Sequence, residues 1–272
     1  MRKVKQEFLS AAEIRERRLQ LLYKILPIIS LLLLVGLWLL ASSGDSSFPS
    51  PSEVWERTLA LFMKPIKKKT LIGHVGVSLR RIGLALLFDW TAGIAFGVFL
   101  GWCPRAKAFF GPLFNAFRAV PPLAWIPLIT LWFGIGEFPK VLIVIFGSLA
   151  SIVVNVQAGL SGVEKMYLDV GTVFNATPQQ RLMKIAFPSA LDAIFAGVRT
   201  STSAAWMVVL AAEMLGADAG VGFLISRGMD SLDMPLVLTG MIAIGLVGAL
   251  LAIITQFAER MICPWTRRKK SY

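Results

Sequence analysis

Long stretches without a charged residue dominate this sequence. Residues 25–44, 141–163 and 234–258 contain no Asp, Glu, Lys or Arg. Each is long enough for a transmembrane helix, which needs about 20 predominantly apolar residues. Three shorter charge-free stretches reach that length when each is extended through one charged residue. The pattern predicts an all-α polytopic membrane protein, and its six expected spans are residues 21–41, 82–102, 110–133, 140–160, 193–215 and 236–258.

The composition supports this class. Hydrophobic residues make up 56% of the 272 positions, against roughly 45–50% in soluble domains, and charged residues 16%, against about 25%. These values argue against a soluble enzyme, a disordered chain and a secreted disulfide scaffold. Cys103 and Cys263 are too few for a disulfide framework. His74 is the lone histidine, which argues against a histidine-based metal site or catalytic triad, and no metal site is expected.

Basic residues set the expected orientation. The net charge of +12 could indicate nucleic acid, but Lys and Arg collect in the cytoplasmic loops of membrane proteins. Basic segments lie at both ends, residues 1–24 and 266–272, and six spans put both ends on one side. Both termini are therefore expected in the cytoplasm, residues 25–265 are expected to form the transmembrane domain, and no nucleic-acid partner is expected. The lysine-rich segment 64–69 conflicts with this orientation, because it would lie outside.

The first span and the segment after it each allow two interpretations. Small residues at 41–43 and a basic start suit a signal peptide, but the apolar run exceeds the 7–15 residues of such a peptide, so a retained helix is expected. Ser50-Pro51-Ser52-Glu53 is a capping box with proline at the first helical position. The helix that follows either lies on the outer membrane surface or packs as an ordinary loop helix.

The loop at residues 161–190 is predicted to contain two short helices outside the bilayer. Met166, Val170, Val173 and Phe174 recur at i, i+4, i+7 and i+8, which gives the first helix one apolar face. Asn175 suits the left-handed position that ends a helix.

A second capping box, Thr177-Pro178-Gln179-Gln180, then begins the other helix. Leu182, Ile185 and Ala186 continue this helix, and Pro188 is expected to end it. The apolar face of the pair needs a partner outside the bilayer. Lipid headgroups, the rest of the chain or another protein could each supply it.

Four ionisable residues fall within the predicted spans, where such groups are functional candidates by default. Arg118 could attract an anionic solute, or it could sit at a helix end or pair with a carboxylate. Glu213 is placed near the outer end of the fifth span, where it could equally contact an outer partner. Asp89 would repel an anion and is expected to be a structural partner or a near-interface residue, and Arg199 is expected to reach towards the cytoplasmic interface.

Prolines interrupt the third span. Pro121 and Pro122 remove helix hydrogen bonds beside Arg118, and irregular backbone within a membrane is tolerated where it is buried or lines a cavity. Residues 118–127, which include Trp125, are therefore predicted to line the solute pathway. A kinked packing helix is the alternative.

A stripe of small residues marks the second span. Gly93, Gly97 and Gly101 repeat at every fourth position, a pattern that lets helices approach closely. Packing within the subunit is expected rather than a contact between subunits.

The 161–190 loop resembles the cytoplasmic "EAA" loop of inner-membrane permease subunits in binding-protein-dependent ABC importers. That pattern is Glu-Ala-Ala, three residues, Gly and a later hydrophobic-Pro pair. Asp169-Val170-Gly171, Asn175 and Phe187-Pro188 stand at those positions here. Further strings resemble the nitrate/sulfonate/taurine-type permeases, over about residues 49–265. They are Pro49-Ser50-Pro51-Ser52, Ser78-Leu79-Arg80-Arg81, Arg118-Ala119-Val120-Pro121-Pro122-Leu123-Ala124-Trp125-Ile126-Pro127, Leu131-Trp132-Phe133-Gly134-Ile135-Gly136-Glu137 and Ala211-Ala212-Glu213-Met214-Leu215-Gly216.

The resemblance implies a type I ABC-importer permease fold in a bacterial inner membrane, working as a homodimer. It implies cytoplasmic ATPase subunits that dock into the loop and an extracytoplasmic binding protein that delivers a small anionic solute such as nitrate, a sulfonate or taurine. The sequence has no Gly-x-x-x-x-Gly-Lys-Ser/Thr phosphate loop, so ATP and Mg²⁺ are expected in the partner subunit and no cofactor in this chain. The residues expected at the ATPase interface are Met166, Asp169, Val170, Gly171, Val173, Phe174, Asn175, Ala176, Thr177, Gln180, Leu182 and Pro188. The residues expected along the pathway are Arg118, Pro121, Pro122, Trp125 and Glu213.

Two other functions can be weighed on the residues alone. A stand-alone secondary transporter or channel would explain six spans and buried charges, but not the capped helix pair outside the bilayer. A membrane-embedded enzyme would need clustered His, Cys or carboxylate residues, which the sequence lacks. A requirement for ATP and partner chains discriminates an importer subunit from a stand-alone transporter.

Overall fold

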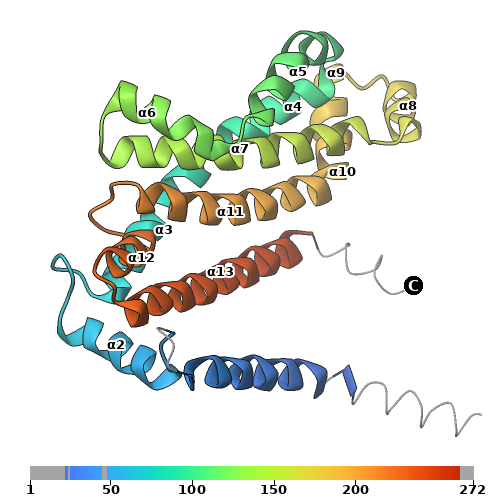
Figure 1. The fold of residues 1–272 in the computed structure, drawn as a ribbon. Helices are drawn as coiled ribbons and strands as arrows, with labels where there is room; N and C mark the ends of the chain where they lie inside the picture. Colours follow the sequence, from blue (N-terminus) through green and yellow to red (C-terminus); the bar gives the residue numbers. More distant parts are fainter. Residues whose placement is uncertain (1–21, 24, 45–47, 264–272) are drawn as a thin grey trace, which may run out of the picture. The chain divides into compact units, whose positions relative to one another are not determined.

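The computed structural model describes residues 22–23, 25–44 and 48–263, and these are predominantly helical (Figure 1). The basic segment 266–272 and nearly all of segment 1–24 lie outside the described residues. The chain divides into two compact units, residues 1–57 and 58–272.

The first unit contains a helix, Ile25–Ser42, that is long and apolar enough to cross a membrane. Its large apolar side chains are exposed, as they are in a span that faces lipid. The predicted capping box follows. The backbone N–H of Ser50 donates to the Glu53 carboxylate (2.8 Å), and the N–H of Glu53 donates to the Ser50 hydroxyl (3.4 Å). This box begins α2 (Pro51–Met63), which continues into the second unit.

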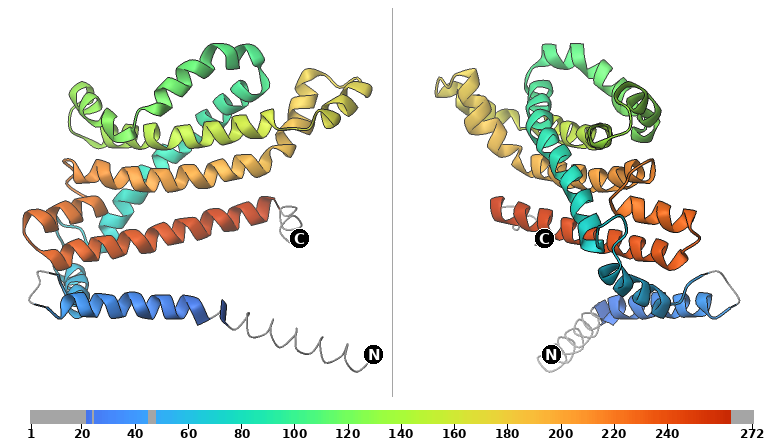
Figure 2. Two further views of the ribbon diagram at one scale, coloured as in Figure 1. Left: turned by 45° about the vertical axis from the view of Figure 1, so that its right-hand side comes forward. Right: turned by 90° about the vertical axis from the view of Figure 1, so that its left-hand side faces the viewer.

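Long helices form the bundle of the second unit. One runs from Leu71 to Trp102 and consists of α3 (Leu71–Phe88), a π-helical turn η1 (Asp89–Gly93) and α4 (Ile94–Trp102). The others are α7 (Glu137–Ser161), α11 (Leu191–Met214) and α13 (Met234–Ile262), which match three predicted spans within a few residues. Helices α7, α11 and α13 lie side by side in Figures 1 and 2, and α4 packs on α7.

The helix of the second span extends further towards the N-terminus than the predicted span, which starts at residue 82. The helix begins at Leu71, where the Thr70 hydroxyl caps it by accepting the N–H of Gly73 (3.3 Å). The charge-free run ends at Arg81, and a single sequence does not reveal whether a partner neutralises that charge. In the fold Arg81 is buried and paired.

The predicted third span, residues 110–133, is broken at its prolines, in keeping with the interruption that the sequence predicts. The chain forms α5 (Pro104–Ala119), a 3₁₀ turn η2 (Pro122–Trp125) and α6 (Ile126–Phe133), and the pair is bent by 88°. Val120, the residue before Pro121, takes an extended conformation, as steric contact with a following proline ring requires. Among the described residues, five helices are individually long and apolar enough to span a membrane, and the bent pair makes a sixth if it counts as one span.

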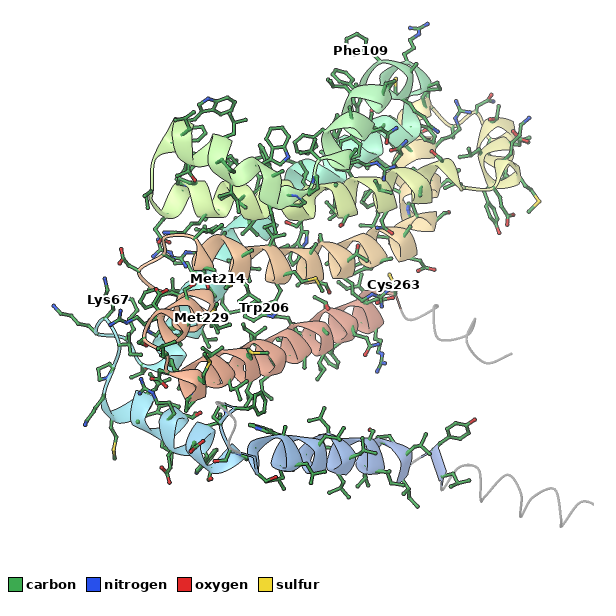
Figure 3. The ribbon with its side chains drawn as sticks, viewed as in Figure 1. Lys67, Phe109, Trp206, Met214, Met229 and Cys263 are labelled. Carbon is green, nitrogen blue, oxygen red and sulfur yellow. The ribbon has the colours of Figure 1, made fainter. Side chains whose placement is uncertain are left out.

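Two ends of the bundle can be distinguished. The start of α3, the α6–α7 turn and α12 (Val221–Asp230) lie at one end in Figure 1, whereas the α4–α5 turn, the 161–190 segment and the end of α13 lie at the other. In Figure 3, Lys67 lies at the first of these ends and Cys263 lies at the second. The 161–190 loop and the C-terminal end of α13 thus share one side, as predicted. The direction of that side relative to the cytoplasm stays a prediction.

The lysine-rich segment lies at the end opposite to the 161–190 loop, so its conflict with the charge rule remains. Lys67 and Lys68 both have positive φ in a tight turn bridged between Ile66 and Lys69. The ammonium of Lys67 donates to Asp218 (2.8 Å), and this hydrogen bond and charge lower the pKa of the Asp218 carboxyl.

The glycine stripe packs inside the subunit, as expected. A Cβ at Gly93 would lie 2.6 Å from Ile152, one at Gly97 would lie 2.7 Å from Val156, and one at Gly101 would lie 2.9 Å from the Leu160 side chain. All three partners lie on α7 and belong to the largest apolar core. Glycine is therefore required for the close approach of this span to α7.

A side chain at Gly97 is expected to destabilise the helix bundle, because overpacking a close contact costs about 1–3 kcal/mol. We expect Gly97→Leu to lower the thermal unfolding midpoint of the purified protein in detergent. Gly83→Leu is the matched control on the same span, since a Cβ there meets no atom within 4 Å. Equal midpoints for the two variants would contradict the packing assignment.

Candidate functional site

The first helix of the 161–190 segment, α8 (Lys165–Val173), ends as the sequence predicts. Asn175 has φ 54°. Its N–H donates to the Thr172 carbonyl (2.9 Å), and the N–H of Ala176 donates to the Gly171 carbonyl (2.9 Å). These two bonds form a Schellman motif, which fixes the direction in which the chain leaves the helix.

The second capping box is also confirmed. The Thr177 hydroxyl accepts the N–H of Gln180 (3.2 Å), and the Gln180 side chain accepts the N–H of Thr177 (2.9 Å). The box begins α9 (Pro178–Arg181), which continues through a π turn η3 (Leu182–Ala186) into α10 (Phe187–Ser189).

Pro188 does not end this helix, contrary to the prediction. The N–H of Phe187 bonds to the Leu182 carbonyl five residues back. This wide turn adds a residue just before the proline and lets the helical backbone pass a residue that has no N–H to donate. The helix ends after Ser189, and Ala190 leads directly into α11.

The two short helices pack on each other through Gly171. A Cβ at this position would lie 2.7 Å from the Ile185 side chain, and Arg181 donates to the Thr172 hydroxyl (3.1 Å). Leu168 and Leu182 pack against the core cluster that contains α4, α7 and α11 residues. Gly171 and Leu182, two of the expected interface residues, therefore face inward and hold the pair on the bundle.

The outward face of the pair is apolar. Val173 and Phe174 expose 79% and 80% of their surface, and Met166, Val170 and Met183 are exposed beside them. Of the remaining expected interface residues, Asp169, Asn175, Thr177, Gln180 and Pro188 are exposed and Ala176 is half-buried. We call α8–α10, residues 165–189, the coupling segment. Several large apolar side chains exposed outside the spans are typical of a protein interface.

A cavity of about 520 Å³ lies between α5, α7 and α11. Arg118 lines it from α5, and its Nε donates to the Asn115 side chain (2.9 Å). The Asn155 amide donates to the Ser151 carbonyl (2.7 Å) and to the Thr200 hydroxyl (3.3 Å). The lining residues are Asn115, Arg118, Ala119, Ala150, Ser151, Val154, Asn155 and Thr200.

Of the five polar residues that line this cavity, only Arg118 was predicted from the sequence. The other four are Asn115, Ser151, Asn155 and Thr200. Ser151 and Asn155 stand four residues apart in a charge-free span, so they share one helix face, and that spacing was the available signal. The other expected pathway residues do not line the cavity. Pro121 and Pro122 form the break after α5, and Trp125 packs between Phe117 and Phe146, with ring centroids 5.6 and 5.4 Å away.

Glu213 lies elsewhere, in a buried ionic cluster, so its assignment to the open pathway is corrected. It is 1% exposed. Its carboxylate accepts hydrogen bonds from Arg81 (2.6 Å), Ser78 (2.9 Å) and the N–H of Gly222 (3.0 Å). Arg81 also makes two bonds to Glu137 (2.8 and 2.5 Å). The cluster joins α3, α7, α11 and the start of α12.

His74 belongs to the same end of the bundle and is structural. Its Nδ1 accepts the N–H of Gly220 (3.1 Å), so the ring proton lies on Nε2 and is donated to the Ile66 carbonyl (3.2 Å). The ring thereby joins the lysine-rich turn, α3 and the loop before α12.

Comparison with known proteins decides the family. Residues 93–268 match the family described as "Binding-protein-dependent transport system inner membrane component". The chain belongs to this family of inner-membrane transport permeases. The permease is 31% identical to the taurine transport system permease protein TauC of Escherichia coli (strain K12), over 80% of this chain and 79% of TauC. It is 30% identical to the nitrate import permease protein NrtB of Synechocystis sp., over 94% of this chain and 98% of NrtB.

The fold of the permease matches a solved transporter structure. An inward-facing MetNI methionine ABC transporter aligns with a TM-score of 0.63 at 18% identity, over 76% of this chain and 98% of the matched chain. The match assigns the type I permease fold. Membership of a multi-component transport family excludes the stand-alone transporter weighed from the residues alone, and it identifies the permease as a multi-pass inner-membrane protein.

Two further charges within the permease spans have structural partners. Asp89 is buried in the π turn η1, where its Oδ2 accepts a hydrogen bond from Ser148 of α7 and its Oδ1 has no partner among the described residues. Arg199 of α11 pairs with Glu259 of α13 (2.7 Å), so it links two helices instead of only reaching towards the interface as predicted.

Proposed function

We propose that the permease forms the transmembrane pathway of an ABC importer together with a second copy of itself. An extracytoplasmic binding protein delivers a small anion, and cytoplasmic ATPase subunits dock on the coupling segment and drive transport. The observation that carries this proposal is the apolar outward face of the coupling segment, which lies outside the spans and is exposed in the isolated chain.

The packing of the coupling segment suits a lever. Leu168 and Leu182 insert into the core shared by α4, α7 and α11, and α10 continues into α11. A force applied at Phe174 would therefore reach the membrane helices through close-packed side chains. For ATP to drive the change, the ATPase must bind one permease conformation more tightly than the other. ATP and Mg²⁺ belong to that partner, because this chain has no phosphate loop.

The lining of the cavity supports two parts of the proposal, the second copy of the permease and the anionic solute. Arg118, Asn115 and Thr200 are exposed at or near membrane depth, and polar groups there face a bundle interior or a water-filled cavity rather than acyl chains. A second permease copy would close that face. The relatives named for taurine, nitrate and aliphatic sulfonates handle compact oxygen-bearing solutes, which suit the cationic Arg118.

Reconstitution tests this function. We expect liposomes that contain the permease and its ATPase subunits to import a solute only when ATP and the binding protein are both present, with taurine, nitrate and ethanesulfonate as the probes. A matched preparation with a hydrolysis-deficient ATPase is expected to import none. Solute movement by the permease alone, without ATP, would overturn the proposal.

A further inference from the structure

The cavity between α5, α7 and α11 offers more hydrogen-bond donors than acceptors. Arg118 uses Nε for Asn115, and within the described residues no carboxylate lies within 4 Å of its guanidinium and no hydrogen bond engages Nη1 or Nη2. The Asn115 amide NH₂ and the Ser151 hydroxyl likewise make no hydrogen bond within the described part of the chain. Guanidinium, amide and hydroxyl donors therefore point to a ligand rich in acceptors.

The other polar groups hold this arrangement in place. The Asn155 amide bridges Ser151 and Thr200, and the Thr200 hydroxyl donates to the Ala196 carbonyl (3.0 Å). These bonds engage the Asn155 amide NH₂ and leave its side-chain oxygen as one of the acceptors at the cavity, beside the hydroxyl oxygens of Ser151 and Thr200. Ala119, Ala150 and Val154 complete the lining with small apolar surfaces, which suit a ligand with a compact carbon portion or none.

We infer that this cavity is an anion-coordinating site for a compact oxyanion, either a sulfonate head group or nitrate, with the planar fork of Arg118 as its cation. Two parallel N–H groups of a guanidinium match two oxygens of such an anion, a geometry that an ammonium does not reproduce. This inference rests on the proposed function for its place in transport, but the site itself is testable on the permease alone.

Charge-selective labelling of a cysteine in the cavity tests the site without transport. Ala150→Cys, which places the thiol in the lining and keeps every polar group of the site, is made in a permease whose two native cysteines, Cys103 and Cys263, are replaced by Ala. Its reaction rate is measured with an anionic sulfonatoethyl methanethiosulfonate and with the cationic trimethylammonioethyl analogue, each divided by its rate with glutathione. Any effect of Arg118 on the thiol itself applies to both reagents and cancels in their ratio.

We expect the anionic reagent to be favoured by about tenfold, the lower end of the effect of a cleft lined by one sign of charge. Arg118→Gln is expected to remove this preference, and Arg118→Lys to retain most of it. Arg105→Gln is the matched control, because Arg105 is exposed at the other end of the same helix and does not line the cavity.

Competition tests recognition of the oxyanion itself. Ethanesulfonate or nitrate in excess is expected to slow the labelling when Arg118 is present and to have little effect in Arg118→Gln or Arg118→Lys, which lack the fork. An anionic preference that survives Arg118→Gln, or that Arg105→Gln lowers equally, would overturn the site. Failure of ATP-driven import with a normal labelling ratio would overturn the proposed function and leave the anion site standing.

Discussion

Replacing Val173 and Phe174 together by Gln is expected to weaken ATPase binding to the permease by about 10²- to 10⁴-fold. Both side chains are almost fully exposed in the isolated chain, so a docked partner would bury them. Burying one large apolar side chain contributes about 1.5–3 kcal/mol, and two give about 3–6 kcal/mol. Gln is a better helix former than Val, so α8 and its Schellman turn are expected to remain intact.

The affinity is measured between purified permease in detergent and the ATPase subunit, by calorimetry and by co-purification. Leu232→Gln is the matched control. Leu232 is also exposed and apolar, but it lies between α12 and α13 at the opposite end of the bundle. We expect that variant to bind the ATPase normally. Unchanged affinity of the Val173 and Phe174 double variant would refute the coupling segment as the docking site.

Removing Arg81 is expected to produce the largest loss of stability of any single substitution considered. Arg81 and Glu213 are 2% and 1% exposed, and breaking a buried ion pair by removing one partner costs about 3–5 kcal/mol, because the other charge stays buried without compensation. In Arg81→Met the Glu213 carboxylate would keep only the Ser78 hydroxyl and the Gly222 N–H. We expect a clear fall of the thermal unfolding midpoint in detergent.

A second substitution separates charge from packing. Adding Glu213→Gln to Arg81→Met removes the buried charge and keeps an acceptor for Ser78 and Gly222, so the double variant is expected to be more stable than the single one. Arg199→Met serves as the comparison. Its pair with Glu259 is partly exposed, and such pairs contribute about 0–1 kcal/mol. If the double variant is no more stable than Arg81→Met, the loss comes from packing and the charge argument is wrong.

The ionic cluster and His74 also tie the loop before α12 to α3 and α11. The backbone N–H groups of Gly220, Val221 and Gly222 donate hydrogen bonds to the side chains of His74, Ser78 and Glu213, respectively. Arg81 donates to the Ala219 carbonyl (2.7 Å). The first N–H groups of a helix have no partner within it, so these side chains complete the start of α12. The cluster therefore fixes the end of the bundle that lies opposite the coupling segment.

Features with local causes were predictable. The boxes at Ser50 and Thr177 and the left-handed Asn175 all formed, because each depends on residues within three or four positions of one another. The apolar face of α8 followed from its periodicity in the same way. The end of the helix at Pro188 could not be predicted, because the π turn before it changes the hydrogen-bond register and no residue pattern indicates that turn.

A helical membrane protein, its resemblance to a permease family and the two capped helices of the coupling segment could all be predicted from the sequence. The partners of its buried charges could not, because they depend on how the helices pack. Arg81 can lie inside a span because Glu213, 132 residues away, neutralises it, and Arg118 lines a cavity because α7 and α11 bring Asn155 and Thr200 beside it. Burying a charge is tolerated only with a compensating group, and that group is fixed by helix packing rather than by any neighbour in the chain.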